Sequence, residues 1–265
     1  MAVNSPIMTI MMRASEKAAR SLLRDFNEVE HLQVSRKGPG DFVSAADRRS
    51  EEIIYAELSK ARPDYAFLME ESGVKGNKDS DFRWIIDPLD GTSNFLHGLP
   101  HWCISIALEH NGEIVAGLVH DPVKDEIFSA EKGKGAFMSR RRLRISGRDT
   151  AEASMIAIGQ PSHSQAKRDL FNAEYKAMQM AGFGLRRFGA AALDLAYVGA
   201  GRFDGYWERG LKPWDVAAGY LIAKESGGFI SDIDDKKKNP VDTGNVLVAN
   251  ERLYEPMKKV LKTAA

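Results

Sequence analysis

The 265-residue sequence predicts a mixed α/β fold. Two observations carry this prediction: the middle of the chain is rich in strand patterns, and beyond about residue 150 strands alternate with helices. The length and the 43% hydrophobic content suit one large domain or two closely joined lobes with a sizeable core. We place the boundary between an N-terminal lobe of residues 1–145 and a C-terminal lobe of residues 146–265, which together form one unit.

In the N-terminal part, helical spacing of apolar residues predicts a helix over residues 7–29 and another over residues 44–61. A Gly/Pro break at residues 37–40 separates the two helices, and Pro63 ends the second one. Short apolar runs predict strands over residues 66–69 and 82–86, and the polar residues 73–81 between them predict a loop.

The middle of the chain predicts strands over residues 103–110, 114–120 and 126–130, with turns at Asn111-Gly112 and Asp121-Pro122. The C-terminal part then alternates between the two element types. Strands are predicted over residues 155–159, 203–208 and 246–249. Helices are predicted over residues 164–181, 190–200 and 213–225, and a last helix reaches about residue 261.

Charge and cysteine content exclude several classes of protein. Lys and Arg number 37, as do Asp and Glu, so the chain lacks the basic excess of a dedicated nucleic-acid binder. The single cysteine, Cys103, excludes an intramolecular disulfide framework and suits a reducing compartment. Neither a transmembrane pattern nor a signal peptide is evident, so we expect a cytoplasmic protein without membrane partners. Cys103 opens a predicted strand and is expected in the core.

The densest functional pattern is the segment from Trp84 to Phe95. An apolar run places Asp87 at its end, and Asp90 follows after a Pro-Leu pair. The next residues, Gly-Thr-Ser-Asn, are typical of a helix N-terminus, whose free N–H groups bind phosphate. Two carboxylates repel a phosphate unless a cation lies between them, and a divalent hard cation meets that need. Taken alone, the same residues are equally typical of an acidic turn.

Other acids occupy comparable positions. Glu70 also follows an apolar run, Asp215 follows Pro213-Trp214 at a predicted helix start, and Asp47 lies in the first turn of another helix. Each has an ordinary alternative, namely a solvated loop, a favourable interaction with the helix dipole, or a helix cap. Together they predict carboxylates that converge at strand ends and helix starts.

The donor set favours Mg²⁺ over zinc, because carboxylates dominate and there is no Cys/His cluster. The histidines are scattered along the chain, and we interpret them as surface or loop residues rather than catalytic ones. They are His31, His97, His101, His110, His120 and His163.

These motifs resemble the inositol monophosphatase family, in particular its bacterial, SuhB-like branch. The resemblance covers nearly the whole chain and its motifs are highly specific. It rests on the segments 41–47, 70–72, 87–92, 132–137, 186–215 and 227–228, which follow the family's order and approximate spacing.

The resemblance implies a layered αβαβα sandwich of the inositol monophosphatase/fructose-1,6-bisphosphatase type, and a lithium-sensitive, Mg²⁺-dependent phosphatase that is a homodimer. It implies two to three ions. Glu70, Asp87 and the backbone carbonyl of Leu89 would hold the first ion, and Asp87, Asp90 and Asp215 the second. Glu70 would also hold a weaker third ion.

The resemblance also implies roles around the substrate. Thr92 and Asp47, with Glu70, would carry the catalytic chemistry by orienting and deprotonating water. The substrate-binding residues would be Asp90, Gly91, Thr92, Ala191 and Glu208. Gly91 and Thr92 would offer N–H groups to the phosphate, whereas Glu208 and the backbone at Ala191 would meet the substrate's hydroxyls. Ala190 stands where this branch usually has serine.

The expected reaction is hydrolysis of inositol 1-phosphate to inositol and phosphate. Fructose 1,6-bisphosphate, histidinol phosphate and 3′-phosphoadenosine 5′-phosphate stay open as alternative substrates. A different class is an interaction protein in RNA processing or transcription antitermination, to which the basic run Arg140–Arg144 would contribute. The same run is typical of a solvated hairpin edge. The metal-ligand set favours the enzyme.

Overall fold

The computed structural model describes residues 5–28, 34–38, 41–160 and 165–264, and for residues 34–38 and 41–44 it describes the backbone alone. Pro39 and Gly40 of the predicted break therefore lie outside the described residues. So do the histidines His31 and His163. A two-stranded ribbon, β1 (Val34–Gly38) and β2 (Asp41–Ser44), lies between the first two helices in the chain.

Most of the strands form two mixed sheets. The larger sheet has the order β10-β9-β8-β7-β6-β5-β3-β4 and the smaller one β12-β11-β13-β15-β14. The larger sheet consists of β3 (Ala66–Met69), β4 (Gly73–Gly76), β5 (Phe82–Asp90), β6 (Cys103–His110), β7 (Glu113–Asp121), β8 (Glu126–Glu131), β9 (Gly135–Met138) and β10 (Arg141–Arg142). The smaller sheet consists of β11 (Met155–Ile158), β12 (Gly184–Arg186), β13 (Gly205–Glu208), β14 (Phe229–Asp232) and β15 (Val246–Ala249).

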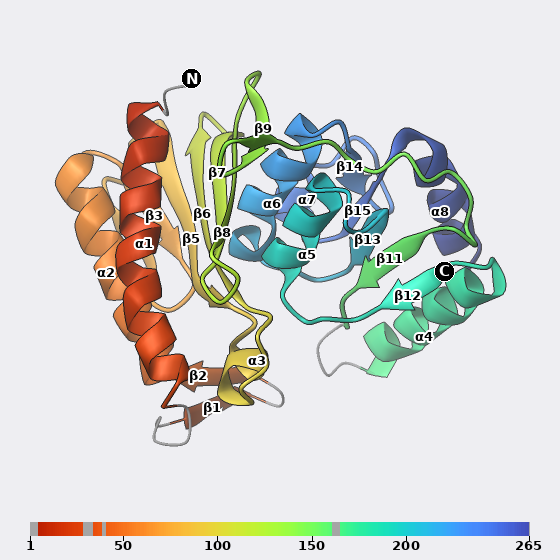
Figure 1. Cartoon of the computed structure of the whole chain (residues 1–265), viewed down its shortest axis with the longest axis horizontal. Coiled ribbons are helices and arrows are strands. Elements are labelled where there is room, and N and C mark those ends of the chain that lie inside the picture. Colours follow the sequence, from red (N-terminus) through yellow and green to blue (C-terminus); the bar gives the residue numbers. More distant parts are fainter. Residues whose placement is uncertain (1–4, 29–33, 39–40, 161–164, 265) are drawn as a thin grey trace.

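The helices complete five layers, which Figure 1 shows from left to right. Helices α1 and α2 cover the outer face of the larger sheet, α5 and α6 lie between the sheets, and α4 and α8 cover the smaller sheet. This arrangement is the αβαβα sandwich predicted. The helices are α1 (Pro6–Phe26), α2 (Ala45–Ala61), α3 (Thr92–Leu96), α4 (Gln165–Met180), α5 (Ala191–Gly199), α6 (Pro213–Glu225), α7 (Pro240–Thr243) and α8 (Glu251–Ala264).

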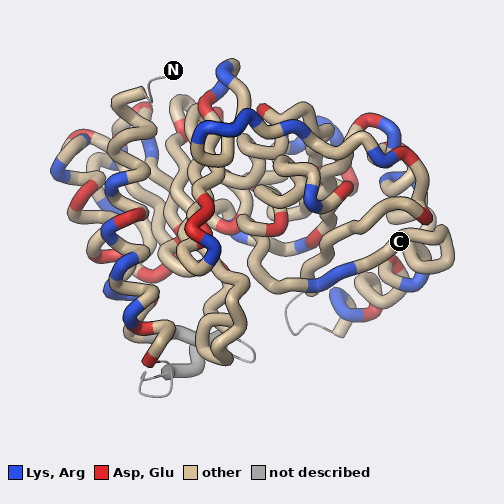
Figure 2. Tube along the Cα trace, viewed as in Figure 1, with Lys and Arg blue, Asp and Glu red and all other residues tan. Residues whose placement is uncertain are grey.

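The outer and central helices differ as their sequences predict. In α1, Met11, Ala18 and Leu22 are buried against the larger sheet, and charged residues lie on its other side. Figure 2 shows charges of both signs along α1, α2 and α4. Every residue of α5 is buried. A side chain at Gly219 of α6 would come within 2.5 Å of Leu195, so this glycine allows α5 and α6 to pack closely.

Several elements differ from the sequence predictions. The prediction of a loop over residues 73–81 is wrong at its start, because Gly73–Gly76 forms β4 at the edge of the larger sheet. This strand is short and mostly exposed, and therefore lacks an apolar alternation. Strand β5 runs beyond Ile86 to Asp90 through an irregular register after Asp87. Strands β1, β2, β9, β10, β12 and β14 and the short helix α7 were not predicted.

His120 corrects the interpretation of this residue type as surface or loop, whereas His101 lies in a loop, as interpreted, but is largely shielded from solvent. His120 lies in β7 with 4% of its surface exposed, and 12% of the His101 side chain is exposed. Burial lowers the pKa of each imidazole to about 4. Cys103 is buried at the start of β6, as predicted. In the described part of the chain, helices long and apolar enough for a membrane span are absent.

Candidate active site

The pairing of β3 with β5 places Glu70 beside Asp87. The two strands are parallel with Met69 opposite Ile86, so the acid that follows each of these residues lies at the same edge of the sheet. The backbone N–H of Glu70 donates to the carbonyl of Ile86 at 3.2 Å, which continues the pairing up to this position. The structure thus brings together the first two predicted ligands.

The end of β5 is held by contacts from two elements. Asp87 Oδ1 accepts a hydrogen bond from Leu89 N at 2.9 Å, and Ser50 of α2 donates to the carbonyl of Pro88 at 2.9 Å. Asp90 lies opposite Cys103 of β6 after the irregular register. The strand thus continues from Asp87 to Asp90 through a bulge at Pro88 and Leu89, and the turn predicted after Asp87 is not formed.

Gly91 is the N-cap residue just before the short helix α3, and its backbone conformation favours glycine. Its φ is +89°, and a Cβ there would lie 3.0 Å from the carbonyl oxygen of His101 and 3.2 Å from Cβ of Ala190. The backbone therefore passes tightly between two neighbouring segments. Thr92 follows as the first residue of α3, and its hydroxyl lies 2.9 Å from the carbonyl of Leu89 and 3.3 Å from Asp47 Oδ1. Asp47 is buried in the first turn of α2.

The remaining acids come from the C-terminal half of the chain. Ala192 N at the start of α5 donates to Asp90 Oδ2 at 2.7 Å, which ties the central helix layer to the end of β5. Asp215 lies in the first turn of α6 and accepts a hydrogen bond from Lys212 N at 2.7 Å. Pro213 starts this helix, a position where its missing N–H has no cost.

Glu208 ends β13, and two neighbours hold its side chain. The hydroxyl of Tyr206 donates to Glu208 Oε2. A Cβ built on Gly159 would lie 1.6 Å from the same oxygen, so glycine leaves the space that the carboxylate occupies. Burial raises the pKa of Glu208 to about 8, although the hydrogen bond from Tyr206 opposes that rise, and the negative charge of Asp215 adds to it.

The proposed ligands raise one another's pKa. Burial raises the pKa of Glu70 to about 8, and the charges of Asp215 and Asp47 add to this effect. Burial raises the pKa of Asp87 well above its usual value, with further contributions from Glu70 and Asp90. Burial also raises the pKa of Asp90 and of Asp215 to about 7 each. The site is therefore a crowded anionic region in which protons or cations stabilise the carboxylates.

The chemistry of the donors fits a hard divalent cation. Within the described ranges, none of Glu70, Asp87, Asp90 and Asp215 forms an ion pair with lysine or arginine. Carboxylate oxygens and a backbone carbonyl are the donors that Mg²⁺ prefers. Among the same residues, no three His, Cys, Asp or Glu side chains already surround a common point as a closed metal site. The fold fixes the backbone at the four proposed ligands, but their side chains do not converge on one common point.

Two residues around the site were missed by the sequence prediction. Glu51 of α2 is buried and accepts hydrogen bonds from the N–H groups of Glu71 at 2.8 Å and Ser72 at 3.4 Å. It thereby fixes the turn that follows Glu70. Ser50, on the same helix, holds Pro88. Local patterns give no indication of either role, since both partners lie far away in the sequence.

Known proteins resemble this chain in sequence and in fold. The model of the inositol monophosphatase family matches residues 3–264. An inositol-1-monophosphatase of Mesorhizobium japonicum is 52% identical over 258 residues, 97% of each chain. The Nus factor SuhB of Xylella fastidiosa is 41% identical and covers 94% of this chain and 93% of its own. The crystal structure of the extragenic suppressor protein suhB from Bartonella henselae superposes with a TM-score of 0.94 at 48% identity, over 98% of this chain and 100% of that one.

Both the family match and the relatives cover nearly the whole chain, and the solved structure has the same layered fold. The resemblance inferred from the motifs is thereby confirmed, and the chain belongs to the inositol monophosphatase family.

Proposed function

We propose that this chain is a Mg²⁺-dependent phosphatase that hydrolyses inositol 1-phosphate. The observation that carries the proposal is the group of four acids at the ends of β3 and β5 and at the start of α6, which the described residues do not neutralise. The relatives named inositol-1-monophosphatase, at 46–52% identity, favour this substrate over the alternative phosphate esters.

Glu70, Asp87 and the Leu89 carbonyl would hold one Mg²⁺, and Asp87, Asp90 and Asp215 a second, with Glu70 reaching a weaker third ion. When bound, the ions would lower the pKa of water and stabilise charge on the phosphate oxygens. The mutual rise in carboxylate pKa supports this assignment, because a cation relieves the repulsion that a proton otherwise relieves.

The chain's own residues would supply the positioning and the proton path. The Thr92 hydroxyl lies between Asp47 and the Leu89 carbonyl, so it can accept a proton from water while it donates its own to Asp47. The N–H groups at Gly91 and Thr92 would bind the phosphate. Glu208 and the backbone near Ala191, whose N–H also faces the Asp90 carboxylate, would bind hydroxyls of the inositol.

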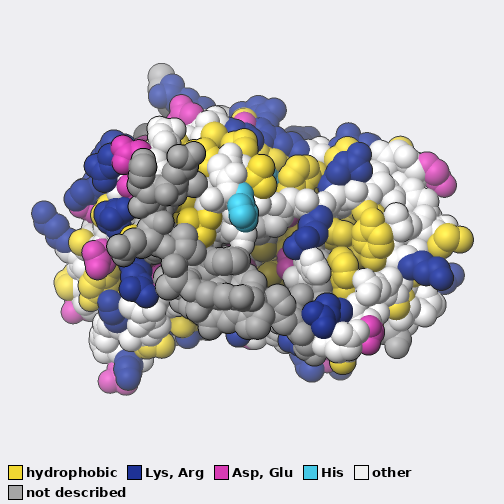
Figure 3. Space-filling model, turned by 90° about the horizontal axis from the view of Figure 1, so that it is seen from below, with side chains coloured by type: hydrophobic (Ala, Val, Ile, Leu, Met, Phe, Trp, Pro, Cys, Tyr) yellow, Lys and Arg dark blue, Asp and Glu magenta, His cyan; other side chains and the backbone are white. Residues whose placement is uncertain are grey.

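The approach of an anionic substrate is also favoured. Helix α3 lies at the bottom of Figure 1, and Figure 3 looks onto this end of the molecule. On its right-hand half, Lys and Arg side chains border an exposed apolar area. Positive charge on this face attracts a phosphate ester.

Phosphate release with purified protein tests the proposal. Inositol 1-phosphate, fructose 1,6-bisphosphate, histidinol phosphate and 3′-phosphoadenosine 5′-phosphate are compared with Mg²⁺, with EDTA, and with added Li⁺. We expect the highest kcat/KM for inositol 1-phosphate, no activity in EDTA, and inhibition by lithium. Preference for another ester would correct the substrate, and full activity in EDTA would refute the metal role. Gel filtration tests the homodimer.

A further inference from the structure

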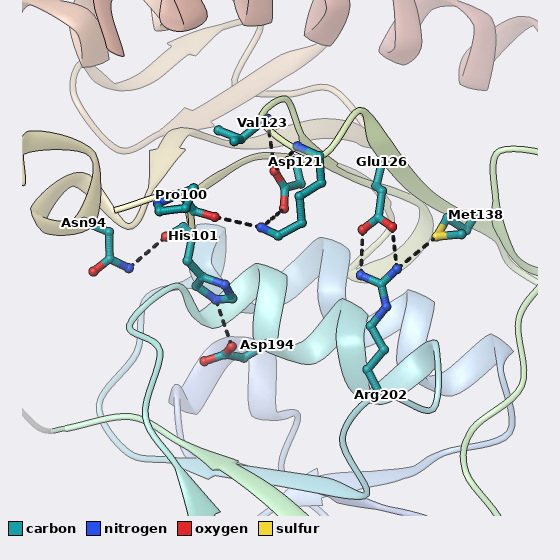
Figure 4. Close-up of polar contacts among 10 residues, drawn as sticks. Asn94, Pro100, His101, Asp121, Val123, Glu126, Met138, Asp194 and Arg202 are labelled. Carbon is teal, nitrogen blue, oxygen red and sulfur yellow. Dashed lines mark hydrogen bonds and ion pairs between the residues drawn. The ribbon is translucent and has the colours of Figure 1, made fainter. Parts of the chain in front are cut away.

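A polar connection links the segment after α3 with the start of α5. His101 Nε2 and Asp194 Oδ1 are hydrogen-bonded at 3.1 Å. Asn94 of α3 donates from Nδ2 both to the carbonyl of His101 at 2.7 Å and to the carbonyl of Phe188 at 2.8 Å. Figure 4 shows His101 pointing from the upper segment toward Asp194 on the helix below. Residues 94–101 and 188–194 are therefore joined at several points.

The His101–Asp194 contact is well shielded from water. The exposed fraction is 12% for the His101 side chain and 2% for that of Asp194. The ring of Phe188 lies 4.9 Å from the imidazole, centroid to centroid, and that of Tyr197 lies 5.8 Å away. A hydrogen bond in such surroundings is stronger than in water, and either partner left alone would lose its compensation for burial.

The segment that carries His101 is itself fixed on the larger sheet. Lys124, in the connection between β7 and β8, donates from Nζ to the carbonyl of Pro100 at 2.7 Å and to Asp121 Oδ2 at 2.7 Å. His101 precedes β6 by two residues, and β6 begins at Cys103, the partner of Asp90. His101 and Asp90 thus belong to one rigid part of the molecule.

The start of α5 contacts the part of the molecule that contains His101 and Asp90 at two points. On one side Ala192 N donates to Asp90 Oδ2 at 2.7 Å, and on the other Asp194 contacts His101. Asp194 lies three residues after Ala191, about one helical turn on, so its position sets that of the first turn. Moving this turn would move the backbone at Ala191, which the proposed function places on a substrate hydroxyl.

We propose that His101 and Asp194 are positioning residues that hold the first turn of α5 in place, so that the backbone at Ala191 meets the polyol part of the substrate. This inference rests on the proposed function and adds two residues to it. Neither side chain needs to touch the substrate, because both act through the backbone of α5.

The main test is the His101→Ala variant, with His110→Ala as matched control. His110 lies at the opposite end of β6, where it stacks on Phe82. With inositol 1-phosphate and Mg²⁺, we expect His101→Ala to raise KM about tenfold and to change kcat less than about threefold, since the lost contact binds substrate and transition state alike. His101→Gln should restore most of the affinity, because its amide can still bond to Asp194.

Two further measurements separate positioning from a general structural role. The ester 4-nitrophenyl phosphate has no hydroxyl for the backbone at Ala191, so His101→Ala should lower its kcat/KM much less than that for inositol 1-phosphate; a small loss can still arise because Ala192 N holds Asp90. In metal-free protein without substrate, hydrogen exchange of the amides of residues 187–195 should be faster in His101→Ala than in the parent or in His110→Ala. Asp194→Asn tests the contact from the other side and is expected to raise KM about threefold.

The outcomes distinguish the two proposals. A parent protein that hydrolyses none of these esters would refute the proposed function. An active parent would overturn the positioning role if KM for inositol 1-phosphate is unchanged in folded His101→Ala, or if both esters lose activity equally. If His101→Ala does not fold, an unchanged KM together with unchanged amide exchange in Asp194→Asn overturns it.

Discussion

Two groups of buried acids in this molecule are stabilised in opposite ways. Asp204, just before β13, is fully buried and accepts hydrogen bonds from Arg148 Nε at 2.7 Å, from Met155 N at 2.6 Å and from Ser146. Asp87 is almost as deeply buried, yet its neighbours include two further acids, Glu70 and Asp90, which raise its pKa.

The difference in charged neighbours indicates the role of each acid. Asp204 joins distant segments of the fold and is paired with Arg148, and Asp121 holds the connection after β7 and is paired with Lys124. An acid left without such a partner is costly to keep ionised, so its place in the fold needs another explanation. For the site at the end of β5, the explanation we propose is binding of an external cation.

The largest expected effect is loss of activity in Asp87→Asn. With saturating Mg²⁺, kcat/KM for inositol 1-phosphate should fall at least about a thousandfold, because one proposed ligand serves two ions. Asparagine can still accept the bond from Leu89 N, and one repelling charge is gone. The melting temperature in EDTA should therefore stay the same or rise. Activity near that of the parent would remove Asp87 from the metal site.

Asp204→Ala should show the reverse pattern. Removing this carboxylate leaves the N–H of Met155 and the guanidinium of Arg148 without their partner, which should lower the free energy of unfolding by about 3 kcal/mol. Activity per folded molecule should be unchanged. Urea unfolding and phosphate release measure the two quantities. A folded variant of parental stability would contradict the comparison.

Gly159→Ala tests the acid that ends β13. The added methyl group would occupy the position of the Glu208 carboxylate, so Glu208 must move away from Tyr206. We expect KM for inositol 1-phosphate to rise about tenfold. Gly147→Ala is the matched control, because a Cβ there meets no atom within 4 Å. Equal KM values in both variants would show that the Glu208 rotamer is unimportant.

A smaller effect is expected from pH on the metal-free protein. The folded-state pKa is about 8 for Glu70 and about 7 for Asp90 and Asp215, whereas the ordinary values are 4.5 and 3.8. The folded state therefore holds more protons than the unfolded one, and stability should fall as the pH rises from about 6.5 to about 8.

His101 and His120 have a folded-state pKa of about 4 against an ordinary value of 6.5, so their loss of protons in the unfolded state opposes the fall in stability near pH 6.5 and ceases to matter toward pH 8. The measurement is the melting temperature in EDTA and in Mg²⁺ across this range. We expect a decrease of several degrees in EDTA and a smaller one with Mg²⁺, which binds the ionised carboxylates. Identical profiles would indicate that Mg²⁺ does not bind this site.

The smallest effect is expected from Arg141→Glu. This residue is exposed in β10, the edge strand of the larger sheet, where like the rest of the basic run it borders solvent. Exposed charges contribute little to stability or to a distant site. Both kcat/KM and the melting temperature should match the parent. A collapse of hydrolysis would show that the basic run belongs to the active site.

Local sequence patterns predicted the bounds of several helices and strands correctly. Helix α6 and the strands β3, β6 and β15 have the bounds expected from the sequence, because each combines a continuous apolar run with a clear stop. The short edge strand β4 was missed, since its pairing with β3 is decided by a neighbour and leaves little pattern in its own residues.

By itself, the sequence determined the family and the positions of the candidate ligands along the chain. Asp87 and Asp90 lie on either side of Pro88 at the end of an apolar run, and Asp215 follows a proline that starts a helix. These are local properties, set by residues a few positions apart.

Only the tertiary structure decided which residues meet. The parallel register of β3 and β5 places Glu70 beside Asp87, Glu51 fixes the turn after Glu70, and the contact of His101 with Asp194 spans 93 positions. Such contacts form when separate layers pack, and a short stretch of sequence contains no record of its distant partner. The equal numbers of acids and bases are likewise a property of the whole chain, whereas packing decides which acids receive a base and which are left for a cation.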